Sequence, residues 1–316
     1  MSSPLVTLAI PCRADEPALG RTLAAAAASW ARAPESATHA LEVLVCVNGR
    51  DGARPRADVR AFAASAGTDA VELDVDAAHP PPLPPLAGPR AVVALVTQRA
   101  GKPLAWNVLR RYARGPVAVF VDADVSFTPD AFGVLLAALD AAPAAVLASA
   151  KTTCAPRPGG FERIMAVPYG IDFPNLSAQL YAARVAGLPA VMPDDLIEPE
   201  RWLELVVGRD VLVRTPAARV AVRLPGTLAD FFRQRVRIEM GKVQLARDYP
   251  GLESRGVPQP RLRAALASLA PADVARLATY LALRSLAHGI AWWRWRRGRT
   301  ADVWRQAATT KSWDAA

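Results

Sequence analysis

Two aspartates, Asp122 and Asp124, follow an apolar run that begins at Val117. Alternate residues of an extended chain point to the same side, so both carboxylates can face one ligand. Carboxylate oxygens are hard ligands, and they suit a Mg²⁺ or Mn²⁺ ion that keeps some of its waters and bridges phosphate oxygens. Aspartate is also common where a strand simply ends, so the tripeptide alone supports a turn equally well.

Polar side chains also follow two other apolar runs of the first half. Arg13 and Asp15 come after Val6–Pro11, and Asn48 comes after Leu41–Val47. Ligands of open α/β sheets bind beyond the carboxyl ends of the strands, which would place these side chains at one edge. The sequence therefore predicts a ligand site there.

A cation lies at the expected start of a helix. Lys102 follows Gly101 and precedes the helix predicted over Leu104–Arg114. Helix N-termini and cations both favour anions, so this arrangement suits a diphosphate. A lone lysine at a helix start is more often a solvated surface charge. Its position shortly before the strand that ends at Asp122 favours phosphate binding instead.

The elements that would position these residues alternate between short β-branched runs and longer Ala/Leu-rich runs. This order is typical of an α/β fold with a mostly parallel sheet flanked by helices. Parallel strands are covered on both faces, which explains their continuous apolar runs. The predicted strands are Val6–Pro11, Leu41–Val47, Val92–Thr97, Val117–Asp122 and Ala145–Ala150, and the predicted helices are Glu16–Ala33, Arg56–Ala66, Leu104–Arg114 and Pro129–Ala142, the last with Thr128 as N-cap.

The second half changes character. We expect a helix over Leu176–Val185, a hairpin-like strand pair at Val211–Val213 and Arg219–Val222, and an arginine-rich helix over Leu228–Ala246. Helices dominate after that point. In the first half, the segment His79–Pro89, which precedes the strand predicted at Val92–Thr97, contains six prolines. These exclude helix and ladder pairing and predict an exposed loop.

The composition excludes several classes of protein. Hydrophobic residues make up 52% and charged residues 21% of the 316, which excludes a disordered charged tail protein. The three cysteines, Cys12, Cys46 and Cys154, are odd in number and widely spaced, which disfavours a disulfide framework and indicates a reducing compartment. The segment Met1–Pro4 leads directly into a strand-like run, so we expect no secretory signal.

The net charge of +9 is concentrated at one end of the chain. Arg255–Ala316 contains 11 Lys+Arg against 3 Asp+Glu, and five of the eight tryptophans lie there: Trp292, Trp293, Trp295, Trp304 and Trp313. A nucleic-acid partner is not expected, because no binding motif accompanies the charge.

The apolar part of this region, Val274–Arg299, predicts a helix. Arg276, Arg284 and His288 form a polar stripe that disfavours a membrane-spanning helix. The wide apolar remainder suits a helix lying in the surface of an anionic bilayer, with tryptophans at headgroup depth. The alternative is a helix that packs on the catalytic domain with its arginines exposed.

From Leu5 to about Lys242 the sequence resembles the family 2 glycosyltransferases of the GT-A nucleotide-sugar fold. The similarity rests on the opening strand and its acidic turn, on Lys-Pro-Leu-Ala-Trp-Asn from Lys102 to Asn107, and on Asp-Ala-Asp from Asp122 to Asp124. The resemblance implies roles for the matching residues: nucleotide-sugar contacts at Pro11, Arg13, Asp15, Asn48, Lys102, Asp122 and Arg237, metal ligation by Asp124 and Asp122, and acceptor contacts at Gln234 and Trp202.

The general base stays open among three carboxylates. The segment Met192–Leu203 resembles the acidic motif of the family, and within it Asp195, Glu198 and Glu200 are the candidates. Any of them could instead stabilise the N-terminus of a helix that begins near Glu200.

The resemblance implies transfer of a sugar, with inversion, from a nucleotide-diphosphate sugar to a hydroxyl of a lipid-linked or glycan acceptor. A Mg²⁺ or Mn²⁺ ion would stabilise the departing diphosphate, and a carboxylate would take the hydroxyl proton. We expect a GT-A-like domain over residues 1–225 and a helical C-terminal region over 226–316. The expected location is cytoplasmic and peripheral, on the inner face of the cell membrane.

Two alternatives remain. A nucleotidyltransferase that makes a nucleotide sugar would share the fold, but Pro11–Gly20 lacks the glycine-rich basic loop that such chemistry would use. A membrane-associated binding module without catalysis is the other, because Asn48, Pro199 and Ile238 depart from the family pattern. A covalent-triad hydrolase is set aside, since no histidine lies near a serine or cysteine motif.

Overall fold

The computed structural model describes residues 4–79, 82–86, 88–154, 159–171, 175–253 and 269–298. The chain forms two compact units that interleave along the sequence. Unit 1 comprises Met1–Lys151, Leu176–Asp195 and Val207–Val220, and unit 2 comprises Thr152–Asn175, Leu196–Val206 and Ala221–Ala316. The boundary expected near residue 225 therefore stays a prediction, because the compact units do not follow a single cut in the chain.

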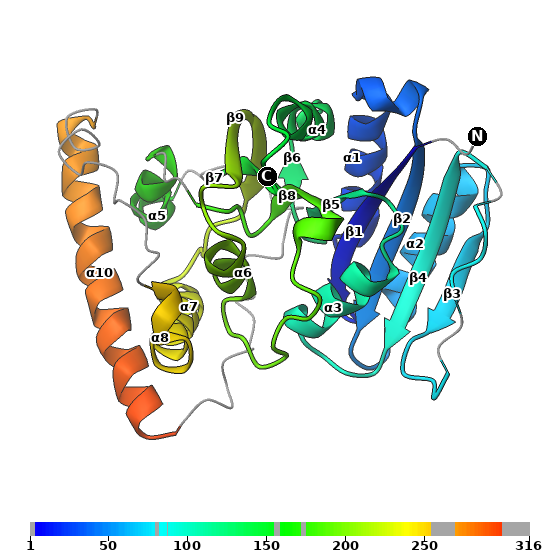
Figure 1. Ribbon diagram of the computed structural model, residues 1–316. Helices are drawn as coiled ribbons and strands as arrows, with labels where there is room; N and C mark the ends of the chain where they lie inside the picture. The colour runs from blue at the N-terminus through cyan, green and yellow to red at the C-terminus, as the bar shows by residue number, and fades with distance from the viewer. Residues whose placement is uncertain are drawn as a thin grey trace. The chain divides into compact units, whose positions relative to one another are not determined.

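A nine-stranded sheet forms the body of unit 1, in the order β3-β4-β2-β1-β5-β8-β7-β9-β6 (Figure 1). The first five strands of this order are mutually parallel, whereas β8 runs antiparallel to β5 and β7. The fold expected from the sequence, a mostly parallel sheet flanked by helices with a helical C-terminal part, is confirmed. The strands are β1 (Leu5–Arg13), β2 (Ala40–Asn48), β3 (Ala70–Asp74), β4 (Arg90–Thr97), β5 (Val117–Val121), β6 (Ser126–Phe127), β7 (Leu147–Cys154), β8 (Leu180–Arg184) and β9 (Leu212–Val222).

Helices connect and cover these strands, and α3 packs against β1 and β2 while α2 packs against β4 (Figure 1). The helices of unit 1 are α1 (Leu19–Arg32), α2 (Ala53–Ser65), α3 (Lys102–Tyr112) and α4 (Ala131–Ala141). Short 3-10 turns, η1 (Pro34–Ala37) and η2 (Val185–Gly187), follow α1 and β8.

A buried charge near the amino ends of the strands is fully paired. Glu42 of β2 accepts a hydrogen bond from the Thr7 hydroxyl (2.8 Å) and forms an ion pair with Arg114 (2.6 Å). An unpaired buried carboxylate would be strongly destabilising, so these partners explain an acid inside an otherwise apolar strand.

Strand register brings the carboxyl ends together at the opposite edge. Arg13 of β1 lies beside Asn48 of β2, and Asn48 lies beside Thr97 of β4. The polar residues that follow these strands therefore share one edge of the sheet, as the sequence predicted.

Three local predictions were wrong. The segment Leu176–Val185, expected to be helical, contains β8, which fills the space between β5 and β7. The expected strand pair within residues 211–222 is the single strand β9. Helix α4 begins after Asp130, because Thr128 pairs with Arg219: its N–H donates to the Arg219 carbonyl (2.9 Å), and its hydroxyl accepts from the Arg219 N–H (3.2 Å).

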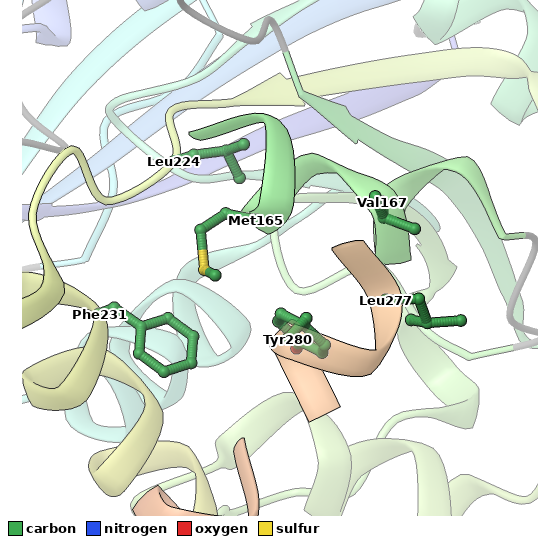
Figure 2. Close-up of a cluster of buried hydrophobic side chains, with 6 residues drawn as sticks. All are labelled: Met165, Val167, Leu224, Phe231, Leu277 and Tyr280. Carbon is green, nitrogen blue, oxygen red and sulfur yellow. The ribbon is translucent and has the colours of Figure 1, made fainter. Parts of the chain in front are cut away.

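Unit 2 is helical, with α5 (Gly160–Gly170), α6 (Pro199–Val207), α7 (Leu228–Asp248), α8 (Pro250–Glu253) and α10 (Pro271–Arg296). Figure 2 shows its core, where side chains from α5, α7, α10 and the segment after β9 meet. The buried residues of this cluster are Met165, Val167, Leu224, Phe231, Leu277 and Tyr280. A second cluster joins α10 to α7 through Ile197, Val236, Met240, Ala287 and Ala291.

Helix α10 starts three residues before the helix expected over Val274–Arg299 and covers most of it, whereas Trp304 and Trp313 lie outside the described residues. Within the residues that the structure describes, none of the helices combines the length and the apolar character that crossing a membrane requires.

Candidate active site

Asn48 ties three elements together at the carboxyl edge of the sheet. Its side-chain nitrogen donates to the Cys12 carbonyl (2.8 Å), and its side-chain oxygen accepts from the Gly101 N–H (3.1 Å). Gly101 has a φ of 153°, a backbone conformation that favours glycine. The buried Asn48 amide thus fixes the end of β1 against the start of α3.

Arg13 and Asp15 form an exposed pair at the end of β1. The guanidinium donates two hydrogen bonds to the carboxylate, at 2.9 and 2.8 Å. Pro11 precedes them at a position where β1 pairs with β2 only, since its pairing with β5 extends from Val6 to Ala9. The missing proline N–H is therefore compatible with a strand that is central in the sheet.

The first aspartate of the Asp-Ala-Asp tripeptide is paired with the predicted lysine. The Lys102 ammonium lies 2.7 Å from a carboxylate oxygen of Asp122, and it also donates to the Ala178 carbonyl (3.1 Å). The tripeptide backbone is held too, because the Asp122 N–H donates to the Gln179 carbonyl (3.0 Å) and the Thr22 hydroxyl donates to the Ala123 carbonyl (2.8 Å). The cation and the carboxylate that the sequence placed together are in contact.

The carboxylates at this edge of the sheet suit a divalent cation that keeps part of its water shell. Among the described residues, no group of three or more His, Cys, Asp or Glu side chains is arranged to hold a metal ion. An ion bound by Asp122 and Asp124 would need water and substrate oxygens to complete its coordination. Mg²⁺ and Mn²⁺ bind in this manner next to phosphates, whereas a structural zinc site would need four protein ligands.

The segment that precedes the candidate bases is fastened to α3. Asn107 hydrogen-bonds with both main-chain groups of Met192, each at 2.7 Å, and with one carboxylate oxygen of Asp194 (3.0 Å). Arg99 donates to the other oxygen of Asp194 at 2.8 Å. Asp195 follows, exposed, as the last residue of this part of unit 1.

Glu198 and Glu200 belong to unit 2, around the start of α6. Burial raises the pKa of Glu198 to about 7, from an ordinary value of 4.5, and the opposing charge of Arg237 limits the rise. The close approach of α7 accounts for the burial: a Cβ at Gly241 would clash with the Glu198 side chain, and Gln244 accepts a hydrogen bond from the Ile197 N–H (2.9 Å).

The remaining predicted residues also lie in unit 2. Arg237 and Gln234 are partly buried residues of α7, and the positive charge of Arg237 acts on Glu198. Trp202 is buried in α6, where its ring lies edge-on to Tyr249 with 6.4 Å between the ring centroids. Unit 1 thus contains the predicted metal residues and the predicted donor residues except Arg237, whereas unit 2 contains Arg237 together with Glu198 and Glu200.

One group at the sheet edge was not predicted. Asp76 accepts hydrogen bonds from the Thr97 hydroxyl (2.8 and 2.9 Å to its two oxygens) and from the Gln98 N–H (2.7 Å). It follows β3, a strand that the sequence analysis did not identify. The alternation of apolar and acidic residues from Val71 to Asp74 is a period-two pattern that could have indicated this strand.

Solved structures resemble this chain at low sequence identity. The mannosyltransferase PcManGT from Pyrobaculum calidifontis, solved with GDP-Man and Mn²⁺, has a TM-score of 0.55 and 18% identity, with coverage of 100% of this chain and 89% of that chain. This similarity shows the GT-A fold.

Two further structures match over a smaller part of the chain. Glucosyl-3-phosphoglycerate synthase from Mycobacterium tuberculosis, solved with Mn²⁺, UDP and glucosyl-3-phosphoglycerate, has a TM-score of 0.46 and 14% identity, with coverage of 81% of each chain. Mannosyl-3-phosphoglycerate synthase from Rubrobacter xylanophilus has a TM-score of 0.47 and 16% identity, with coverage of 81% of this chain and 77% of that chain.

Sequence comparison identifies the family. No curated protein matches the chain. The model of glycosyl transferase family 2 matches residues 7–166, just over half of the chain. Together with the GT-A fold, this match confirms the resemblance seen in the sequence, and the chain belongs to glycosyl transferase family 2.

Proposed function

We propose that this glycosyltransferase moves a sugar from a nucleotide-diphosphate sugar to an acceptor hydroxyl in one displacement with inversion, and that Glu198 is the general base. The observation that carries the choice of base is the burial of Glu198 against α7, where a Cβ at Gly241 would overlap its side chain, and this burial raises the pKa of Glu198 to about 7. A base whose pKa lies near the working pH combines an ionised fraction with a useful affinity for the proton.

The displacement breaks one bond as another forms. The acceptor oxygen attacks the anomeric carbon while the Glu198 carboxylate takes the hydroxyl proton. The bond between that carbon and the diphosphate oxygen breaks, and the diphosphate leaves with the electron pair. The product then has the opposite anomeric configuration to the donor, which NMR of the product would reveal.

Unit 1 supplies the groups that hold the donor. Lys102 and the N-terminus of α3 suit the diphosphate, because both attract negative charge. Arg13, Asp15 and Asp122 are the proposed contacts with the rest of the nucleotide sugar, while Asn48 fixes the strand ends around them. Asp124 and Asp122 would hold Mg²⁺ or Mn²⁺, which supplies positive charge for the departing diphosphate.

Three conservative variants test the base. Glu198→Gln should lower kcat at least about a hundredfold, the usual scale of general-base catalysis, and leave donor affinity within twofold. Asp195→Asn and Glu200→Gln are matched controls, each replacing one carboxylate by its amide, and they should lose less than tenfold. Loss of the hundredfold by either control, with Glu198→Gln active, would refute the assignment.

The metal proposal has a binding readout. Mn²⁺ should strengthen the thermal stabilisation of the protein by UDP or GDP, and Asp124→Asn should remove that increment. An increment of equal size in the variant would exclude Asp124 as a ligand. A screen of UDP-, GDP- and dTDP-sugars in the same assay would identify the donor base.

Two other functions predict different results. A nucleotidyltransferase would release pyrophosphate when given a nucleoside triphosphate and a sugar 1-phosphate. A binding module without catalysis would bind a nucleotide sugar and leave it intact. The family and the tuned carboxylate of Glu198 favour glycosyl transfer over both.

For the acceptor and the location, we propose a lipid-linked or glycan hydroxyl met at the anionic inner face of the cell membrane. Helix α10 supports this proposal. Its exposed positions from Val274 to Trp293 carry apolar, small or hydroxyl side chains together with His288; Leu286 is 57% and Trp292 46% exposed.

The charges of α10 are arranged so that this outward face stays apolar. Arg276 pairs with Asp273 (2.6 Å), and Arg284 pairs with Glu239 of α7 (3.3 Å). At the C-terminal end, Arg296 and Arg297 stack on Trp292 and Trp293, with 3.8 and 4.4 Å from each guanidinium carbon to the ring centroid. An apolar face that ends in tryptophans and arginines matches the boundary between acyl chains and anionic headgroups.

Vesicle co-sedimentation tests this location. The full-length protein should bind vesicles with 30% phosphatidylglycerol in phosphatidylcholine and lose most of that binding in the Arg296→Gln/Arg297→Gln variant. Arg32→Gln/Arg50→Gln is the matched control, because it removes the same charge from exposed positions of unit 1. Equal binding by the two double variants would refute docking through α10.

A further inference from the structure

Asn107 of α3 holds a segment that has no secondary structure of its own. Its side-chain nitrogen donates to the Met192 carbonyl (2.7 Å), and its side-chain oxygen accepts from the Met192 N–H (2.7 Å). The amide thereby satisfies both polar groups of one residue, as a neighbouring strand would. The Met192 side chain is buried, so this point of the chain is held both by its main-chain hydrogen bonds and by the packing of its side chain.

A second contact extends the hold to Asp194. One carboxylate oxygen of Asp194 accepts from the Asn107 nitrogen (3.0 Å), and the other pairs with Arg99 (2.8 Å). Both side chains of the pair with Arg99 are at least half exposed, and such pairs contribute little. The contacts of Asn107 therefore constrain Met192–Asp194 more than the pair with Arg99 does.

The same helix holds the donor side of the site. Lys102, about one and a half turns before Asn107, is the residue that pairs with Asp122. Helix α3 thus links the first carboxylate of the Asp-Ala-Asp tripeptide to the segment that continues along the chain into Asp195 and Glu198. A shift of Met192–Asp194 would move the starting point of the chain that carries the candidate bases.

We infer that Asn107 is a positioning residue for glycosyl transfer, which fixes Met192–Asp194 and so acts on turnover and not on donor binding. This inference rests on the proposed transferase function. A purely structural role predicts something different: the variant would be less stable, but its folded fraction would turn over at the normal rate.

Three variants of the full-length protein separate these roles. Asn107→Ala removes every contact of the amide. Asn107→Asp keeps an acceptor for the Met192 N–H but places a carboxylate against the Met192 carbonyl and against Asp194. Adding Asp194→Asn to Asn107→Asp gives the new carboxylate a donor again. Arg99→Ala is the control, because it removes only the exposed pair with Asp194.

The readouts are kcat, donor affinity, Tm, and hydrogen exchange at the Met192 amide. Asn107→Ala should lower kcat at least about tenfold, since small misplacements of reacting groups cost up to a hundredfold. Its donor affinity should stay within twofold, and Met192 should exchange faster. The kcat of Asn107→Asp should be at least as low, and adding Asp194→Asn to it should recover part of that kcat. Arg99→Ala should lower kcat less than threefold.

Two results would overturn the inference. In the first, kcat of Asn107→Ala per folded molecule equals that of the wild type while Tm falls, which indicates structure alone. In the second, donor affinity falls by the same factor as kcat/KM. Absence of transfer by the wild-type protein would refute the proposed function and this inference with it, whereas wild-type transfer with an unaffected Asn107→Ala variant would refute the inference alone.

Discussion

Replacing Glu198 by glutamine should stabilise the protein above neutral pH while it removes turnover. Burial raises the pKa of this carboxyl from 4.5 to about 7. The folded protein therefore holds the proton more tightly than the unfolded chain does. The stability that this protonation contributes is fully present below pH 4.5 and is lost as pH rises through about 7.

The size of the effect follows from the pKa difference. At about 1.4 kcal/mol per pH unit, the change from 4.5 to about 7 corresponds to roughly 3 kcal/mol. The Glu198 side chain is only partly buried, so solvent reduces this figure, and we expect about 1–3 kcal/mol. Glutamine has nearly the same shape and does not ionise, so the variant does not lose this stability as pH rises.

Urea unfolding at pH 5.0 and pH 8.5 measures the difference. The free energy of unfolding of Glu198→Gln, relative to that of the wild type, should be about 1–3 kcal/mol higher at pH 8.5 than at pH 5.0. Asp195→Asn, which changes an exposed carboxylate of the same segment to its amide, is the reference variant for this measurement. The reasoning is refuted if Glu198→Gln shifts stability equally at both pH values, or if it keeps wild-type turnover.

Three other changes have defined outcomes. Arg237→Gln removes a positive charge that lowers the pKa of Glu198, so the acidic limb of the kcat/KM profile should move to higher pH; an unmoved limb would separate Arg237 from the base. Lys102→Met removes the 2.7 Å ion pair with Asp122 and should weaken donor binding by about ten- to a hundredfold in calorimetry, whereas unchanged affinity would exclude a phosphate role. Gly241→Ala adds a methyl group where the Glu198 side chain lies, and it should destabilise the protein by about 1–3 kcal/mol and lower kcat; a wild-type melting curve would contradict the close packing.

The strands of the first half could be predicted because their surroundings are uniform. Parallel strands are covered on both faces, so β1, β2, β4 and β5 consist mostly of apolar residues, with polar residues after them, although Thr7 and Glu42 lie inside β1 and β2. The end of one such run pointed to Asp122, and the predicted start of a helix pointed to Lys102, with which Asp122 pairs.

The failures have one physical origin, which is long-range context. The alanine-containing segment that includes β8 has helical propensity, but the open edge of β5 determines its conformation. The three candidate bases could not be ranked from the sequence, because the burial that sets the pKa of Glu198 comes from Gly241, more than forty residues further along. Asp76 was missed because β3 was missed.

The interleaving of the two units affects how the chain can fold during synthesis. The strand that covers the free edge of β5 is β8, and β9 completes the same sheet with residues of a still later segment. A nascent chain that has reached only Lys151 therefore exposes the β5 edge, and exposed edges pair readily with other chains. Unit 1 becomes complete only after the ribosome has added Val220, and by then parts of unit 2 have already been made.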